Sequence, residues 1–516
     1  MSRKRQIHLG PEGPSLLSRN FRKSSILNVT SGVMSKMMLI VFGILGRRFV
    51  IQYLGNDVNG LNSLFASIIA VLSIADLGIA SAITYCMYEP IVKGEKEKVA
   101  ALYGLFKKLY TRIGLFMLTA GLVITPFLPA IAKGNSRSDM QLAFILWLVA
   151  TVLGYFNSAR CSLISAYKDD YITTSVNFAG VVLQYVIQFA ACIFARSYII
   201  YMTAFIVSTV IQMAVIYVIS EKKHGDITSI RVKPDKELEK EVRKNVGATF
   251  FHRAGDAVVN ASDSMIISSL IGVVTLGKYM NYATIIQHMT DVLRQVFRPL
   301  QSVLGHVNVL SSKEEKLRYF NFFFDMNFML GIIFFLGFYA ASDDLVALVF
   351  GRGLKIDKTI LVIVTIDFFL QFMRECNILF RGATGAFYYD RHVPLIEAIV
   401  NIILSIALGQ KFGIAGVLGA TIITVLVLRH TTEPYVVLAK GIGTDPYPHI
   451  LKAFGSFCLF CILLFITDHL MAGGPASFSR MMENGCISLL VSGVTCFIIL
   501  AIRRDTREIL LRKLGR

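Results

Sequence analysis

Charged side chains lie inside the long apolar stretches of this sequence, and their types and spacing point to chemistry. Lys36 and Arg253 occupy equivalent positions in two similar apolar segments, and Arg160 and Arg381 do the same further along. A charge at the centre of a membrane helix costs about 2.5–3.5 kcal/mol, so it normally faces protein or water. Four cations converging on a central cleft would suit an anionic ligand, above all a diphosphate, whose oxygens match guanidinium donors. For Arg160 and Arg381 the alternative is a place near the cytoplasmic helix ends, from which long side chains extend to the lipid headgroups.

Two neighbouring stretches in the second half of the chain carry polar stripes at helical spacing. Residues three or four apart share one face of a helix. The first stripe consists of His252, Arg253, Asp256, Asn260 and Asp263, and the second of Asp291, Arg294 and Arg298. We interpret the two stripes as one wet wall of a cavity. The alternative is that each stripe forms a structural ion pair between an acid and an arginine three residues away.

Asp256 and Asp263 are candidates for binding a coupling cation. Acids at membrane depth are usual in ion-driven carriers, where a carboxylate takes up the ion that drives transport. The sequence therefore indicates a possible coupling to Na⁺ or H⁺, and no other cofactor.

The elements that position these charges are long apolar helices. Hydrophobic residues make up 54% of the 516 residues, charged residues make up 17%, and the mean hydropathy is +0.61. This composition excludes a soluble domain. We expect an all-α polytopic membrane protein with about fourteen spans, which start near residues 25, 60, 109, 140, 173, 198, 246, 279, 319, 359, 393, 412, 450 and 485. The polar first 24 residues and the long apolar stretch after them indicate no removable signal peptide.

The chain contains an internal repeat. Residues 28–134 match residues 245–351 at a constant offset of 217, which brings Gly60 onto Gly277 and Lys36 onto Arg253. Further on the offset becomes 221 and relates Arg160 to Arg381. Because each copy holds an even number of spans, the copies should point the same way across the membrane, related by a pseudo-twofold axis along its normal. A hydrophobic chain of two like halves is the plan of a transporter.

The repeat predicts two six-helix lobes and a terminal pair of helices. We expect a cytoplasmic segment in residues 1–24, an N-lobe in 25–220, a cytoplasmic linker in 221–245, a C-lobe in 246–439, two further spans in 440–503 and a basic tail in 504–516. The tail could form an amphipathic helix on the inner leaflet. A simple positive-inside anchor is the alternative.

The net charge of +18 raises the question of nucleic acid, which the placement of the basic residues decides. The segments richest in Lys and Arg are residues 3–23, 93–108, 222–244 and 503–516, and all are cytoplasmic if the N-terminus is inside. The basic balance therefore indicates topology and contact with anionic lipids, with both termini in the cytoplasm, and argues against nucleic-acid binding.

Enzyme motifs are absent from the sequence. It contains no GxxxxGK[ST], GxSxG or HExxH and no two-cluster zinc pattern. The predicted outer loops are too short for a catalytic domain, so we expect no enzymatic activity. Cys458 and Cys461 form a CxxC pair within an apolar helix without partner histidines, which favours buried thiols over a metal or redox site.

Three segments carry a resemblance to a known family. They are residues 53–99, with a short glycine-containing turn followed by Asp-Leu-Gly, the segment from Arg160 to SAYKDDY, and RGATGAFYYDRH at residues 381–392. On these segments the chain resembles a Wzx-type polysaccharide flippase of the multidrug/oligosaccharidyl-lipid/polysaccharide exporter superfamily, over essentially its whole length.

The resemblance implies a function, a substrate and a location. It implies alternating access that moves an undecaprenyl-diphosphate-linked oligosaccharide from the inner to the outer leaflet of a bacterial plasma membrane. It also implies a cationic central cavity with contributions from Lys36, Arg253 and Arg298, and partners among the polymerase and glycosyltransferases of the same pathway. A lipid II flippase and an ion-coupled drug or metabolite antiporter of the same superfamily are the alternatives.

Overall fold

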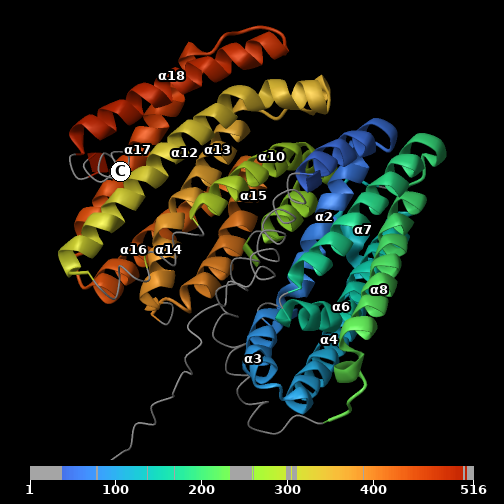
Figure 1. Ribbon diagram of the computed structural model, residues 1–516. Coiled ribbons are helices and arrows are strands. Elements are labelled where there is room, and N and C mark those ends of the chain that lie inside the picture. The colour runs from blue at the N-terminus through green and yellow to red at the C-terminus, as the bar shows by residue number, and fades with distance from the viewer. Residues whose placement is uncertain are drawn as a thin grey trace, which may run out of the picture. The chain divides into compact units, whose positions relative to one another are not determined.

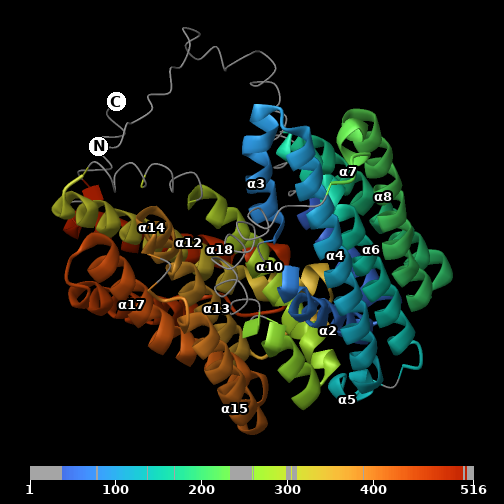
Figure 2. The ribbon, with the colours of Figure 1, turned by 90° about the horizontal axis from the view of Figure 1, so that it is seen from below.

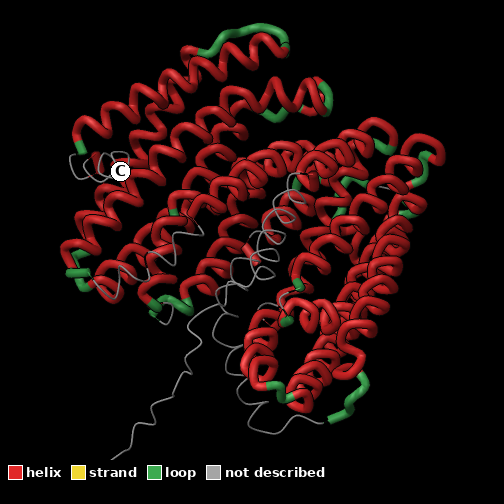
Figure 3. The backbone as a smooth tube through the Cα atoms, viewed as in Figure 1, coloured by secondary structure: helices red, strands yellow, loops and turns green. Residues whose placement is uncertain are grey.

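The computed structural model of the protein describes residues 38–76, 79–135, 137–167, 169–232, 258–259, 261–297, 304, 311–386, 389–503 and 506–507. Every regular element within these residues is helical, as the tube in Figure 3 shows, so the predicted all-helical class is confirmed. Within this part of the chain, eight helical runs are long and apolar enough to cross a membrane: Lys96–Ile131, Met140–Ala166, Asp170–Ala195, Tyr198–Thr228, Lys313–Val349, Val393–Ile442, Tyr447–Leu470 and Phe478–Ile502. The chain is a multi-pass membrane protein.

One of these runs folds back on itself. Helix α15 (Val393–Thr424) contains a non-helical Gly413 with φ of 61°, a conformation that favours glycine. The Asn401 amide donates a hydrogen bond to the Thr421 hydroxyl at 3.0 Å across 20 residues, whereas those residues would lie about 30 Å apart in a straight helix. The run Val393–Ile442 therefore makes two antiparallel passes, in agreement with the two spans predicted to start near residues 393 and 412.

The chain divides into two compact units. The first unit comprises Met1–Gly46, Gly78–Ala120 and Ile145–Val246, and the second comprises Arg47–Leu77, Gly121–Phe144 and Gly247–Arg516. Two segments of the second unit, residues 47–77 and 121–144, therefore lie between segments of the first unit along the chain. The predicted lobe boundaries at residues 220 and 246 follow the order of the chain and remain a prediction.

The first unit is a bundle of long helices. It contains α3 (Ile79–Lys93), most of α4 (Lys96–Ile124) and α6 (Met140–Ala166), α7 (Asp170–Ala190) and α8 (Tyr198–Thr228), labelled in Figure 1. Helices α7 and α8 pack against each other along their length. Close approach is possible because Gly180 leaves room for the Gln212 side chain. Trp147 of α6 stacks on Phe205 of α8, with the ring centroids 4.9 Å apart.

The second unit holds the remaining described helices, which Figure 1 and Figure 2 show from two directions. They are α2 (Asn56–Leu72), the short α5 (Leu128–Ile131), α10 (Val273–Phe297), α12 (Lys313–Val349), α13 (Lys358–Met373), α14 (Glu375–Thr384), α15, α16 (His430–Tyr435), α17 (Tyr447–Leu470) and α18 (Phe478–Ile502), with π-helical turns η6 (Val425–Arg429) and η7 (Val436–Ile442) on either side of α16. Helix α2 packs on α10, and α12 packs on α13, α17 and α18. The apolar core is rich in aromatic rings, and Phe369 stacks on Phe460 with centroids 3.7 Å apart.

Side chains at the helix starts explain several element boundaries. Ser312 accepts a hydrogen bond from the Glu315 backbone N–H at 3.3 Å and begins α12. Asp357 accepts one from the Thr359 N–H at 2.8 Å and begins α13. These caps satisfy backbone donors that a helix leaves without partners in its first turn.

Helices α17 and α18 are joined to α12 by ion pairs in its first and second halves. Near its end, Asp344 pairs with Arg480 of α18. Near its beginning, the buried Asp325 pairs with Lys452 of α17 at 2.7 Å and accepts a hydrogen bond from the Thr506 hydroxyl at 2.8 Å. The terminal pair therefore belongs to the second unit.

Candidate functional site

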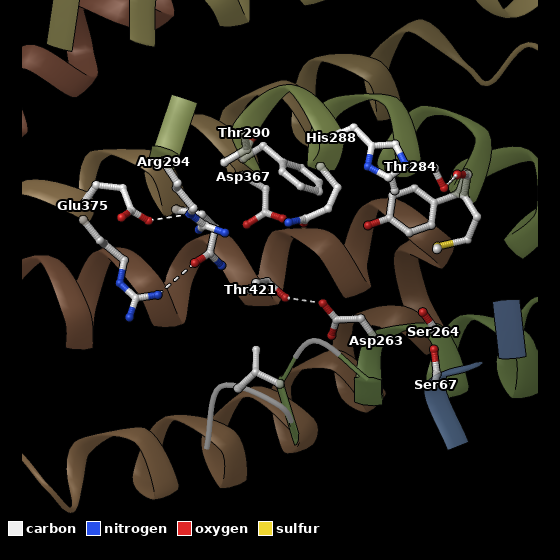
Figure 4. A pocket seen from close by; sticks show the side chains of 18 of the residues that line it. Ser67, Asp263, Ser264, Thr284, His288, Thr290, Arg294, Asp367, Glu375 and Thr421 are labelled. Carbon is white, nitrogen blue, oxygen red and sulfur yellow. Dashed lines mark hydrogen bonds and ion pairs between the residues drawn. The ribbon is translucent and has the colours of Figure 1, made fainter. Parts of the chain in front are cut away.

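A cavity of about 890 Å³ lies within the second unit. Its walls come from α2, the residues just before α10, α10 itself, α13, α14 and α15 (Figure 4). The volume is in the range of pockets that bind small molecules or parts of larger ones. Its charged and titratable lining residues are Asp263, Tyr279, His288, Arg294, Asp367, Arg374, Glu375 and Glu397.

Both arginines that line the cavity have acidic partners. The Nε of Arg294 lies 2.5 Å from Oε1 of Glu375, the contact drawn at the left of Figure 4. The Nη2 of Arg374 lies 2.9 Å from Oε1 of Glu433, which is 1% exposed. These pairs neutralise the positive charge of the wall, so neither guanidinium is well placed to bind an anion in this arrangement.

Two carboxyl groups in the same wall lack such compensation. Asp263 accepts a hydrogen bond from the Thr421 hydroxyl to Oδ2 at 2.9 Å, as Figure 4 shows, but its Oδ1 has no hydrogen-bond partner among the described residues. Oδ1 of Asp367 is likewise buried without a partner within the described part of the chain. A buried carboxylate oxygen without a donor is costly, and a bound cation or proton removes that cost.

The Thr421 hydroxyl that binds Asp263 belongs to a group of polar side chains on α15. The Asn401 amide donates to the Thr421 hydroxyl at 3.0 Å, and the Asn401 carbonyl oxygen is buried without a hydrogen-bond partner in the described part. The Ser405 hydroxyl donates to the Val417 carbonyl at 3.4 Å, one turn before Thr421. The fold of α15 at Gly413 thus joins polar side chains of its two passes next to the hydroxyl that binds Asp263. Oxygen ligands of this kind suit a small hard cation.

The sequence-predicted residues fall into three groups. Asp263 lines the cavity, and its role in ion coupling remains a prediction. Arg160 lies in the first unit and Arg381 in the second. The other predicted site residues, Lys36, Arg253, Asp256 and Arg298, lie outside the described residues.

Arg160 and Arg381 are each engaged within their own unit. The Nη1 of Arg160 lies 2.7 Å from Oε1 of Glu221, and its guanidinium lies 4.3 Å from the centre of the Tyr217 ring. Arg381 is buried, contacts Asp390 through Nη1, and lies 3.7 Å from Glu433. A role for either arginine in binding substrate remains a prediction.

Arg381 belongs to a buried ionic network that extends to the cavity. The network consists of Arg374, Arg381, Arg429, Asp390, Glu397 and Glu433. Arg429 is 1% exposed and links Glu397, a cavity residue, to Glu433. Glu433 is central because it lies within 4 Å of all three arginines.

Several of these residues escaped prediction from the sequence. Glu433 falls near a proline in a short polar segment, and Thr421 and Asn401 are uncharged, so none stood out as a charge within a span. The spacing of Thr421 and Thr424 on one helical face was an available signal. The ion pair between Arg294 and Asp291, which was the alternative to a cavity wall, is the longer contact at 3.8 Å, and Glu375 is the nearer partner.

Comparison with known proteins relates this fold to membrane transporters. No protein-family model matches the sequence, and no curated protein matches it significantly. The chain is similar to a solved structure of the lipid II flippase MurJ in an inward closed conformation, with a TM-score of 0.64 and 14% identity over 95% of this chain and 100% of that one. It is also similar to an inward-facing multidrug resistance MATE family transporter of the MOP superfamily, with a TM-score of 0.56 and 13% identity over 85% of this chain and 99% of that one. At these identities the likeness establishes a shared fold.

Proposed function

We propose that the protein is a flippase that moves an undecaprenyl-diphosphate-linked oligosaccharide from the inner to the outer leaflet of a bacterial plasma membrane by alternating access. The observation that carries the proposal is the shared fold with the lipid II flippase MurJ over 95% of the chain. That protein is a flippase of lipid II. The sequence resemblance to polysaccharide flippases points to the same class, and the sequence contains none of the enzyme motifs named above.

The diphosphate of such a substrate needs cationic donors. We assign this role to Lys36, Arg253 and Arg298, with Arg160 and Arg381 as further candidates. The cavity of the second unit is a poor site for the diphosphate, because its arginines, Arg294 and Arg374, are neutralised by acids. Substrate binding and ion binding would then use different residues.

Asp263 is our proposed coupling site, with Asp256 as a second candidate. Asp263 is buried, keeps one oxygen without a partner among the described residues, and accepts a hydrogen bond from the Thr421 hydroxyl, which itself accepts one from the Asn401 amide. Uptake of Na⁺ or H⁺ neutralises the carboxylate and lowers the cost of burying it. Such uptake is a way for an ion gradient to favour one conformation over another.

Two related functions stand as second candidates. A lipid II flippase is favoured by the same MurJ likeness. An ion-coupled drug or metabolite antiporter is favoured by the uncompensated carboxylates of the cavity and by the fold likeness to a MATE transporter. Cationic compounds prefer an acidic pocket, whereas a diphosphate does not.

Deletion of the gene in its host distinguishes these functions. The proposal predicts loss of a surface glycan and accumulation of its lipid-linked precursor on the inner leaflet. Arrest of cell-wall synthesis with lipid II accumulation would favour the first alternative. An unchanged surface glycan with altered resistance to cationic drugs would overturn the proposal in favour of the antiporter.

A further inference from the structure

Helices α2 and α10 cross at two glycines that are equivalent in the internal repeat. The offset of 217 relates Gly60 to Gly277 and Asn56 to Val273. A Cβ atom on Gly60 would lie 2.0 Å from the Val273 carbonyl oxygen, and one on Gly277 would lie 2.8 Å from the Asn56 carbonyl oxygen. Gly60 thus approaches Val273, and its equivalent Gly277 approaches Asn56, which is the equivalent of Val273. The contact has the symmetry of the repeat itself.

Hydrogen bonds also join the two helices at the crossing. The Asn59 amide donates to the Gly277 carbonyl at 3.1 Å and to the Asn281 side-chain oxygen at 3.1 Å. The Asn56 amide donates to the Val274 carbonyl at 2.9 Å. Water can replace each of these hydrogen bonds at modest net cost, so their loss does not prevent the crossing from opening.

A second set of contacts joins the same region to the segment after α4. The Ser268 hydroxyl donates to the Ile131 carbonyl at 2.9 Å, and the Val273 N–H donates to the Lys133 carbonyl at 3.1 Å. The Lys133 ammonium donates to the Leu270 carbonyl at 2.8 Å. Here too the partners are mainly backbone carbonyls.

The crossing lies at one end of the cavity. It involves the first turns of α2 and α10, whereas Ser67 of α2 and Thr284 of α10, which lie further along both helices, line the cavity. The predicted topology, with the N-terminus inside, places the first turns of both helices at the outer face of the membrane. A ligand that leaves the cavity outward between α2 and α10 must part these two turns.

We propose that the α2–α10 crossing is a reversible outer closure of the cavity, which Gly60 and Gly277 permit by letting each backbone reach a carbonyl of the other repeat copy. Gly60 is the more demanding position, because its Cβ would approach a backbone atom at 2.0 Å rather than 2.8 Å. The outward direction of opening rests on the proposed alternating-access function, but the closure itself does not depend on any substrate.

The test measures access to the cavity from outside. The eight native cysteines are first replaced by serine or alanine, and Thr284→Cys is then introduced as the only cysteine. Intact cells that express this variant are treated with a membrane-impermeant maleimide. We expect Gly60→Ala to raise the labelling rate several-fold and Gly277→Ala to raise it less. Gly493→Ala is the matched control, because a Cβ there meets no atom within 4 Å among the described residues, and it should leave the rate unchanged. Equal labelling of Gly60→Ala, Gly277→Ala and the control would overturn the proposal.

A second measurement serves if Gly60→Ala does not accumulate. Asn59→Cys and Asn281→Cys replace a hydrogen-bonded pair, so we expect an oxidant to join them by a disulfide. In the same background, Gly277→Ala should lower the yield of that disulfide and Gly493→Ala should not. Absence of the disulfide in the parent, or an equal yield in all three, would contradict the closure. Neither experiment uses a substrate, so a failed flipping assay would leave these results intact.

Discussion

The equivalent arginines Arg160 and Arg381 do the same structural task in two different environments. Each holds a carboxylate on a later helix of its own unit, Glu221 on α8 for Arg160 and Glu433 on α16 for Arg381. In the first unit the Glu221 side chain is 36% exposed, whereas Glu433 is 1% exposed. The repeat therefore preserves the arginine but not the position of its acidic partner, and in the second unit the pair is buried in a larger network.

This difference changes what the two pairs contribute. An exposed ion pair typically stabilises a fold by about 0.2–1 kcal/mol. Removal of one partner from a buried network costs about 3–5 kcal/mol, because it leaves uncompensated charge in a medium of low polarity. The second unit also contains the cavity with its uncompensated acids, so it concentrates both the structural and the ion-binding charges.

Removal of the central acid of the network should have the largest effect. Glu433→Gln leaves Arg374, Arg381 and Arg429 short of one negative charge, so we expect the free energy of unfolding in detergent to fall by about 3–5 kcal/mol. Thermal unfolding followed by size-exclusion chromatography measures the change. A loss below about 1 kcal/mol, the level of an exposed pair, would show that burial does not increase the contribution of the network to the free energy of unfolding.

Neutralisation of the proposed coupling acid should come next. Asp263→Asn removes the charge that attracts a cation while keeping the shape of the side chain, so the apparent affinity for Na⁺ or H⁺ should fall by at least tenfold, or about 1.4 kcal/mol. Transport in reconstituted vesicles at varied Na⁺ concentration and pH provides the measurement. Asp291→Asn is the matched control, since Asp291 is 46% exposed. Equal ion dependence of the two variants would remove Asp263 from the coupling role.

The hydroxyl beside that acid should give a smaller effect. Thr421→Val keeps the shape of the side chain but removes the hydrogen bonds to Asp263 and from Asn401, which should weaken ion binding by about 1 kcal/mol, or roughly fivefold. Thr421→Ser retains the hydroxyl and should restore most of the affinity. If serine and valine behave alike, the hydroxyl does not take part in ion binding.

The ion pair of the first unit should give the smallest effect. Glu221→Gln removes the partner of Arg160 at a half-exposed position, and we expect a loss of about 0.2–1 kcal/mol in the free energy of unfolding. Comparison with Glu433→Gln in the same chromatographic assay measures the contrast between the two copies. A loss as large as that of Glu433→Gln would show that the pair of the first unit stabilises the fold as much as the buried network of the second.

The sequence predicted the elements well because apolar length and repeat spacing are local properties. The all-helical class and the paired passes on either side of Gly413 follow from hydropathy alone. The polar stripe that contains Asp263 also led to a residue of the cavity wall.

The partners of the charges could not be predicted, because they depend on which helix faces which. Arg160 and Glu221 are separated by 61 residues, and Arg374 and Glu433 by 59. Spacing along one helix favoured Asp291 as the partner of Arg294, whereas packing brings Glu375 of α14 closer. Repeat symmetry indicated that Arg160 and Arg381 are equivalent, but it carried no information on their acidic neighbours.

The most direct test of the central claim is a flipping assay with purified protein in liposomes. An undecaprenyl-diphosphate-linked oligosaccharide with a fluorescent label is placed in both leaflets, and a membrane-impermeant quencher is added outside. A flippase makes the inner-leaflet fraction accessible to the quencher, and we expect this result for the protein. Quenching limited to the outer leaflet, together with uptake of a cationic dye by the same vesicles, would contradict it.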